Sequence, residues 1–208
     1  NASVVALDKV RNLAGGDASP LMEEDFAAIL HLSHFDAANL TSYKEAISAE
    51  SALADLASLE ALLLLVNQQQ ALLSAVNTIK DNAPLELLDW QADMLLNDVM
   101  DEPNLSQYNS EAQRLQPIND FSELQRLVNE VNASVVAFDN IQTAVGGDTS
   151  ALTEAVFDAI LDLENYTPAN FSGYLNAIEQ ASRLDDIAAL NTVMAQVNSE
   201  QDFLTLLN

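Results

Sequence analysis

The chain has 208 residues, of which 49% are hydrophobic, and its 32 acidic and 7 basic residues give a formal net charge of −25. This balance excludes a nucleic-acid-binding protein, which needs clustered lysine and arginine to pair with phosphates, and it disfavours binding to anionic membranes. The absence of cysteine excludes disulfides and thiolate metal sites, and the scarcity of glycine and proline favours an all-α chain over a β-sandwich.

The acidity has two interpretations. One is a solvated surface that keeps a long, crowded or secreted protein soluble, and the other is a surface that collects Ca²⁺ or suits a salty exterior. We predict no cofactor, with Ca²⁺ as the weakly supported alternative. The apolar run Leu62–Val66 is too short to cross a bilayer, so we predict no membrane insertion. The chain starts without methionine and stops inside a helical pattern, so we expect it to be part of a longer protein.

An internal repeat organises the whole chain. We predict three repeats, at residues 1–66, 67–131 and 132–197, and the start of a fourth at 198–208. The first and third copies match without a gap at 29 of 66 positions, and the middle copy is more diverged. A unit of this size lies near the lower limit of independent stability, so neighbouring repeats are expected to complete each other's cores.

Each repeat is predicted to contain three helices, and residues 1–14 are interpreted as the end of a preceding third helix. Ser19 as N-cap and Pro20 at the first helical position begin the first helix, with Thr149 or Ser150 serving the third repeat in the same way. This first helix is predicted at residues 20–33, 85–99 and 151–164.

The second helix is predicted at residues 37–49, 102–114 and 168–181, with Asp36, Asp101 and Thr167 as N-caps. Its first turn contains glycosylation sequons, which we interpret as helix-start capping; they begin at Asn39, Asn104 and Asn170. One turn later a tyrosine recurs in register. Helical packing is the main interpretation of these tyrosines and a repeated binding platform is the alternative, which makes them candidate interaction residues: Tyr43, Tyr108 and Tyr174.

The third helix is long and is predicted at residues 55–82, 120–145 and 186–208. Asp120 and Glu123 have capping-box spacing, and the apolar residues that follow lie three and four apart. No glycine or proline interrupts this helix where one repeat meets the next. The boundary residues are Val66, Asn67, Val131, Asn132, Val197 and Asn198. Because half of the helix would pack on each repeat, we predict an elongated rod or solenoid of tandem repeats joined by shared long helices.

No pattern indicates an enzyme. His31 and His34 could face one metal ion, but the third repeat has Asp162 and Asn165 in their places. The Gly15–Asp17 turn supplies one acid, too few for calcium, and favours a helix C-cap followed by an Asx turn. No nucleophile motif, phosphate loop or catalytic carboxylate pair is present.

A recurrent motif gives one resemblance. It reads AANLTSY, DLASL and LVN in the first repeat, PNLSQY and DFSELQRLVNEVN in the second, and PANFSGY and DIAALNTVMAQVN in the third. This combination resembles the tandem α-helical repeats of large secreted bacterial surface or adhesin-like proteins. The resemblance implies an extracellular, cell-surface location and a role as a spacer or fibre component in cell adhesion.

The leading hypothesis is therefore a non-enzymatic, stiff extracellular spacer or fibre-forming segment whose partners are the adjacent repeats of the same chain. One alternative is a helical binding module for a host or matrix protein. Another is a self-assembling filament fragment that associates through the incomplete fourth repeat, whose apolar residues would then need a partner: Phe203, Leu204, Leu206 and Leu207.

Overall fold

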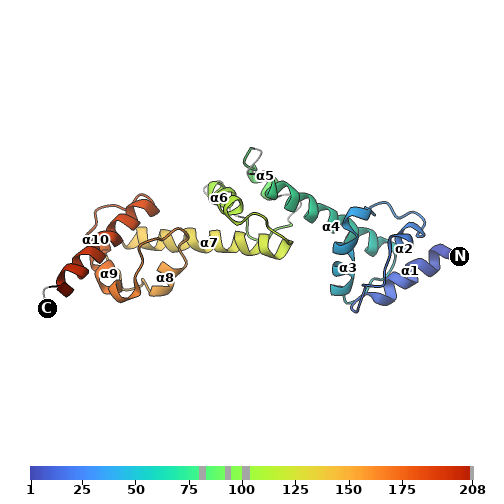
Figure 1. Ribbon diagram of the computed structural model, residues 1–208, viewed down its shortest axis with the longest axis horizontal. Coiled ribbons are helices and arrows are strands. Elements are labelled where there is room, and N and C mark those ends of the chain that lie inside the picture. The colour runs from blue at the N-terminus through green and yellow to red at the C-terminus, as the bar shows by residue number, and fades with distance from the viewer. Residues whose placement is uncertain (80–82, 92–94, 100–103, 207–208) are drawn as a thin grey trace. The chain divides into compact units, whose positions relative to one another are not determined.

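The computed structural model describes residues 1–79, 83–91, 95–99 and 104–206, and these residues form helices and turns without a β-strand (Figure 1). The predicted all-α class is confirmed. The chain divides into two compact units. Unit 1 comprises Asn1–Val99 and Ala112–Leu124, and unit 2 comprises Met100–Glu111 and Gln125–Asn208.

Unit 1 contains a hydrophobic core whose last buried residue in the sequence is Val66, at a predicted repeat boundary. Its helices are α1 (Ala2–Leu13), α2 (Glu23–Ala27), α3 (Leu40–Ala49), α4 (Leu56–Asn77) and α5 (Leu87–Trp90). One core cluster joins α1, α2, α3 and the first half of α4. Its buried side chains include Ala6, Val10, Phe26, Tyr43, Ile47, Leu59, Leu63 and Val66.

Unit 2 repeats this arrangement. Two helices lie partly in each unit, α6 (Leu105–Leu115) and α7 (Phe121–Ala144), and unit 2 also contains α8 (Glu154–Asp158), α9 (Phe171–Gln180) and α10 (Ile187–Leu206). The second half of α7, α8, α9 and the first half of α10 form the core. Its buried side chains include Ala137, Ile141, Phe157, Tyr174, Ile178, Leu190, Met194 and Val197.

The third helix of each repeat crosses the predicted boundary without interruption. Helix α4 passes through Val66–Asn67, α7 through Val131–Asn132 and α10 through Val197–Asn198. Helix α4 ends at Asn77, before the predicted end at residue 82, so that bound is wrong, and residues 80–82 and 207–208 lie outside the described residues. Asp120 accepts the Glu123 N–H (2.9 Å) as predicted for an N-cap, but the Glu123 carboxylate accepts from Asn119 N–H (2.8 Å) rather than from Asp120.

The second helix begins as a 3₁₀ turn that continues directly into an α-helix. The turns are Ala37–Asn39 before α3 and Pro168–Asn170 before α9. Asp36 is confirmed as an N-cap, since its side chain accepts from Ala38 N–H at 3.0 Å. Thr167 stands at the N-cap position with Pro168 after it, as predicted, but its side chain makes no capping bond. Asp101 lies outside the described residues.

The first helix is much shorter than predicted. The described helices are the five-residue α2 and α8 and the four-residue α5, where 14 to 15 residues were expected. Residues in the left-handed conformation follow each of them, namely His31 (φ 68°), Asp98 (φ 59°) and Asp162 (φ 62°). The chain therefore turns away from its helical path before the predicted end.

Serines on the long helices explain why the early turn is tolerated. Leu30 N–H donates to Ser3 Oγ (2.8 Å), and Leu161 N–H donates to Ser134 Oγ (2.9 Å). These side chains replace the backbone acceptor that a longer helix would have offered. The predicted N-caps Ser19 and Ser150 are also wrong. Both donate their N–H to an aspartate two residues earlier, and the helices begin after Met22 and Thr153.

Helix α4 is the one described helix that is long and apolar enough to cross a membrane by length and composition alone. In its first half, Leu59, Leu63 and Val66 belong to the core of unit 1, whereas Leu64 and Leu65 are 39% and 41% exposed. The expectation of no membrane insertion stays a prediction.

Candidate functional site

The main polar cluster of the fold lies at the first repeat boundary. Asn67, on α4, accepts at Oδ1 from the Asn39 amide (2.8 Å) and from the Tyr43 hydroxyl, and its own amide donates to the His34 carbonyl (2.7 Å). The Tyr43 hydroxyl also accepts from Asp36 N–H at 3.1 Å. One asparagine of the long helix is thereby tied to α3 and to the turn before it.

The third repeat has the same cluster. Asn198, on α10, accepts from Asn170 (2.8 Å) and from the Tyr174 hydroxyl, and it donates to the Asn165 carbonyl (2.8 Å). Thr167 N–H donates to the Tyr174 hydroxyl at 3.0 Å. It is the counterpart of the bond from Asp36 N–H to the Tyr43 hydroxyl in the first repeat.

The second repeat supplies a third example. Asn132, on α7, accepts from Asn104 (3.3 Å) and from the Tyr108 hydroxyl. In all three repeats the asparagine is the first residue after the boundary, and it contacts the second helix of the repeat before it. We call this group the boundary cluster: Asn39, Tyr43 and Asn67, then Asn104, Tyr108 and Asn132, then Asn170, Tyr174 and Asn198.

Burial makes the boundary cluster specific for one register between the second and third helices. The rings of Tyr43, Tyr108 and Tyr174 are each 0% exposed, and buried polar groups stabilise a fold only when they are paired. Sliding the long helix by one residue would turn its asparagine away from the tyrosine and leave buried polar groups unpaired. The cluster therefore fixes the register between the second and third helices.

Stacked aromatic rings hold Tyr43 and Tyr174 in place. The Phe26 and Phe35 rings stack at 4.9 Å, and both lie within 6.1 Å of Tyr43. In the third repeat, Phe157 and Tyr166 stack at 5.4 Å beside Tyr174. Because these rings fix the position of the tyrosine, its hydroxyl is already placed for the boundary asparagine.

A second polar contact ties the end of each long helix to the loop before the next one. Arg11 Nε donates to the Leu53 carbonyl (3.0 Å), and Gln142 Nε2 donates to the Leu184 carbonyl (2.9 Å). At the matching position of the middle repeat, Asn77 donates to the Ile118 carbonyl and accepts the Ile118 N–H, both at 2.8 Å. Three different side chains make the same connection.

The predicted site residues divide into buried and exposed groups. The boundary valines are buried, with Val66 at 3%, Val131 at 0% and Val197 at 6% exposure. The candidate interaction tyrosines are also buried, so in this structure their rings offer no exposed binding surface. Phe203 is 61% and Leu204 51% exposed, whereas Leu207 lies outside the described residues.

Sequence reasoning missed the role of Asn39, Asn104 and Asn170. We interpreted them as capping residues, yet Asn39 and Asn170 make no side-chain capping bond, and all three donate to the boundary asparagine. A signal was present. In each repeat a tyrosine follows the first asparagine by four residues, and the boundary asparagine follows that tyrosine by 24.

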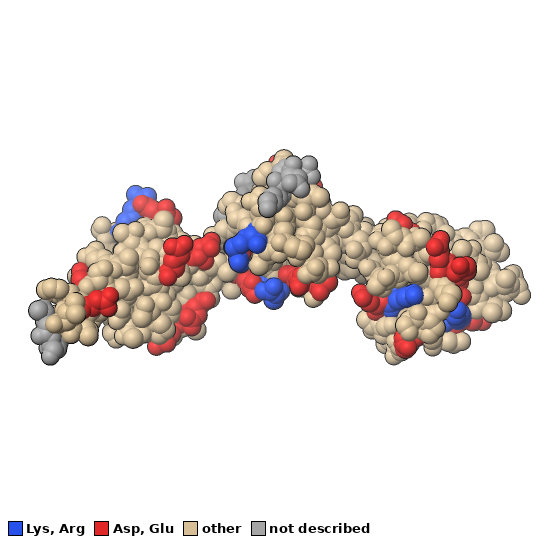
Figure 2. All heavy atoms as spheres, viewed as in Figure 1, with Lys and Arg blue, Asp and Glu red and all other residues tan. Residues whose placement is uncertain are grey.

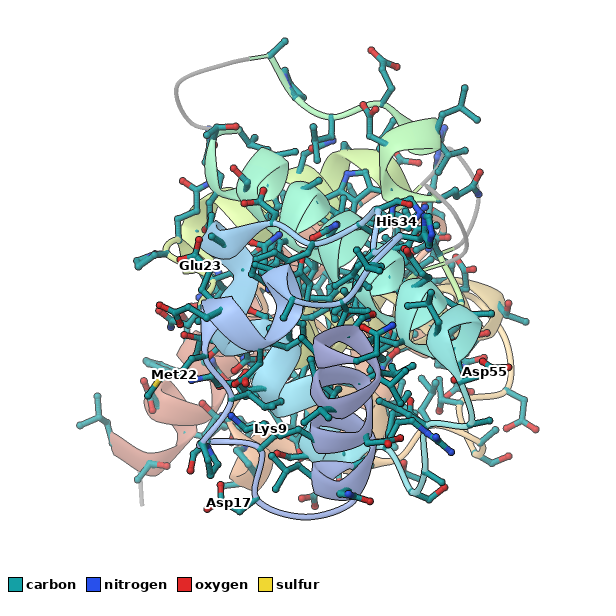
Figure 3. All side chains as sticks on the ribbon, turned by 90° about the vertical axis from the view of Figure 1, so that its right-hand side faces the viewer. Lys9, Asp17, Met22, Glu23, His34 and Asp55 are labelled. Carbon is teal, nitrogen blue, oxygen red and sulfur yellow. The ribbon has the colours of Figure 1, made fainter. Side chains whose placement is uncertain are left out.

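The acidic surface contains little paired charge. Figure 2 shows acidic side chains spread over the visible face with few basic ones among them. Lys9, labelled in Figure 3, pairs with Asp25 across α1 and the start of α2. Burial tends to raise the pKa of Asp25, but the hydrogen bonds from Lys9 and from Met22 N–H lower it below its usual value overall. Among the described residues, no group of three or more histidine or acidic side chains is arranged to hold a metal ion.

Hydrogen bonds also lower the pKa of the turn and cap aspartates. The Ser19 hydroxyl and N–H lower the pKa of Asp17, and the Ser150 N–H and hydroxyl lower that of Asp148. Both carboxylates close the Asx turn expected after the glycine pair, so that interpretation is confirmed.

Comparison of the chain with protein-family models, curated proteins and solved structures found no match.

Proposed function

We propose that this chain is a non-enzymatic structural segment, a stiff spacer built from tandem helical repeats in a large extracellular bacterial surface protein. The observation that carries the proposal is the unbroken passage of α4, α7 and α10 through the three repeat boundaries. A continuous helix resists bending far more than a flexible linker does. The resemblance of the repeat motif to those of bacterial surface proteins supports the location.

The boundary cluster supports the same proposal. A spacer must keep its repeats in one register under load, and a buried, fully paired polar group sets that register. The acidic surface suits this role as well, because like charges keep long chains from associating.

Stiffness can be measured by spin-label distances, since the chain has no native cysteine. Labels on Ala71→Cys in α4 and Asp139→Cys in α7 lie in different units, and both positions are exposed. We expect a single distance distribution that is as narrow as the distribution between labels on Arg126→Cys and Thr143→Cys, two positions within α7. A broad distribution between the units would refute the spacer.

A proline variant tests the continuous helix itself. Ala133→Pro changes an exposed residue just after the Val131–Asn132 boundary, and proline inside a helix costs about 3 kcal/mol and bends it. We expect the distribution between the units to broaden while circular dichroism shows that most helix remains. The control is Ala151→Pro, which places proline where the first repeat has Pro20, and it should leave the distribution unchanged.

A further inference from the structure

One inter-repeat contact inside unit 2 shows how consecutive repeats meet. The left-handed loop at Leu161 and Asp162 lies against α6, and the two together line a small cavity of about 110 Å³. The α6 side of this cavity is formed by Ser106, Gln107, Ser110 and Glu111. The loop is held from its other side by the Leu161 N–H bond to Ser134 of α7.

The matching surface on α9 is an open groove. Counting from the register tyrosines Tyr108 and Tyr174, the positions of Gln107, Ser110 and Glu111 correspond to Gly173, Asn176 and Ala177. These three residues line a groove of about 420 Å³ between α9 and α10. Ser134, which accepts the Leu161 N–H, corresponds in the repeat to Glu200, which lines this groove. The Glu200 carboxylate is also a hydrogen-bond acceptor.

The last turns of α10 expose apolar side chains at positions whose counterparts are buried elsewhere in the described chain. Phe203 corresponds to Ala6, Leu72 and Ala137, which are 5% to 7% exposed, yet Phe203 is 61% exposed. Leu204 corresponds to Leu73, which is 7% exposed, and is itself 51% exposed. The groove and this apolar face adjoin on α10, because Glu200 and Gln201 lie within one helical turn before Phe203.

We propose that the α9–α10 groove and the apolar end of α10 form one docking site for the first two helices and the left-handed loop of another repeat of this class, carried on the same helix. The loop leucine, the counterpart of Leu30 and Leu161, enters the groove, and its N–H donates to Glu200. The two helices cover Phe203 and Leu204. The proposal deepens the spacer function and rests on it, since it identifies the surface by which one repeat recruits the next.

The occupant is inferred from contacts within the chain. Ala6 and Val10 in α1, and Ala137 and Ile141 in α7, are buried against the two helices that come next in the chain. Leu30, the counterpart of Leu161, is 60% exposed. A second copy of the chain is a poorer occupant, because its α1 already fills the place that the end of α10 would take.

The test extends the full chain by one repeat. Residues 12–66 are appended after Asn208, which continues the repeat because Asn208 corresponds to Arg11. The reporter is the thiol labelling rate of Phe203→Cys. We expect labelling to be slower by about tenfold or more in the extended chain than in the 208-residue chain. Ala177→Cys, in the groove, should be protected in the same way.

The matched control is Asp202→Cys. Its counterparts Val5 and Val136 are 67% and 50% exposed even where a repeat follows, so its labelling rate should not change on extension. Equal rates for Phe203→Cys with and without the extension would overturn the proposal, whether or not the added residues gain helix. Concentration-dependent protection of Phe203→Cys in the 208-residue chain would assign the site to a second copy and also overturn it. Neither result depends on the width of the spin-label distance distribution between the units, so the spacer function is tested separately.

Discussion

At the scale of single residues, the boundary asparagines connect the repeats. Asn67 and Asn198 each accept two hydrogen bonds and donate one, all to groups of the second helix or the turn before it. An asparagine inside a helix has no strong local advantage, since its helix propensity is modest. Its value here comes from a buried partner that a shifted register would leave unpaired.

Removing one tyrosine hydroxyl tests this arrangement. Tyr174→Phe leaves Asn198 and Thr167 N–H short of a partner, and unpaired buried groups typically cost about 1–3 kcal/mol. We expect the free energy of unfolding, measured by urea titration, to fall by that amount. The control is Tyr166→Phe, whose buried hydroxyl has no hydrogen-bond partner among the described residues and whose counterpart in the first repeat is Phe35. Equal losses for both variants would contradict a specific role for the boundary cluster.

The N-cap of α7 predicts a pH dependence. The Ser122 hydroxyl and the Glu123 N–H lower the pKa of Asp120 below 3.8, its ordinary value. A carboxyl whose pKa is lower when folded stabilises the protein above the unfolded pKa, and that stabilisation is lost as the pH falls through the folded pKa.

Asp120→Asn should keep the cap, because asparagine caps helices as well as aspartate, but it removes the titration. Between about pH 5 and pH 2 we expect the free energy of unfolding to fall less steeply for the variant than for the native chain. Chemical denaturation at several pH values measures both slopes. Parallel slopes would show that the Asp120 carboxylate contributes nothing to acid sensitivity.

At the scale of elements, the turns after α1 and α7 each depend on one glycine conformation. Gly15 (φ 72°) and Gly146 (φ 70°) adopt left-handed backbone, and their N–H groups donate to the carbonyls of Ile47 and Ile178. The ends of α1 and α7 are thereby joined to α3 and α9. The neighbouring Gly147 has no such requirement, since its φ is not positive.

This difference predicts opposite effects for two adjacent substitutions. Gly146→Ala places a Cβ 3.2 Å from the Ala181 carbonyl in a conformation that costs an L-residue about 1–2 kcal/mol. Gly147→Ala meets only the Ala144 carbonyl at 3.8 Å and should be neutral or slightly stabilising. Thermal unfolding of both variants checks the prediction, which fails if Gly147→Ala is the more damaging change.

At the scale of the whole molecule, repulsion between acidic side chains opposes folding, whereas packing of the long helices against neighbouring repeats favours it. Each described core draws on two long helices, so a repeat without its neighbour loses part of its burial. The net charge of −25 repels itself, and only a few ion pairs among the described residues offset it.

Salt should therefore stabilise the protein. Raising NaCl from about 10 mM to about 500 mM shortens the screening length several-fold, so we expect the unfolding midpoint to rise. KCl at the same ionic strength is the control and should give the same shift, because screening depends on ionic strength rather than on the cation. An unchanged or lower midpoint in calorimetry would show that surface repulsion is not a major term.

Much of the architecture could be predicted from local patterns. The long third helix was expected at residues 120–145 and is found at Phe121–Ala144, because apolar spacing and an N-cap at Asp120 act within a few residues. The second helix was placed equally well. The short first helix was not predicted, since its early end depends on Ser3 and Ser134, which lie 27 residues away from the N–H groups they accept.

The sequence by itself determined the repeat, its period and the continuity of helix across each boundary. A repeat is found by comparing segments of the sequence, and a helix is indicated by the spacing of nearby apolar residues. Only the tertiary structure decided what the recurrent asparagines and tyrosines do. Their hydrogen bonds join residues 24 and 28 positions apart, so their pairing exists only once the second and third helices have packed together. The physical reason is that the contribution of a buried polar group depends on the partner with which it pairs in the folded protein, and not on its position in the sequence.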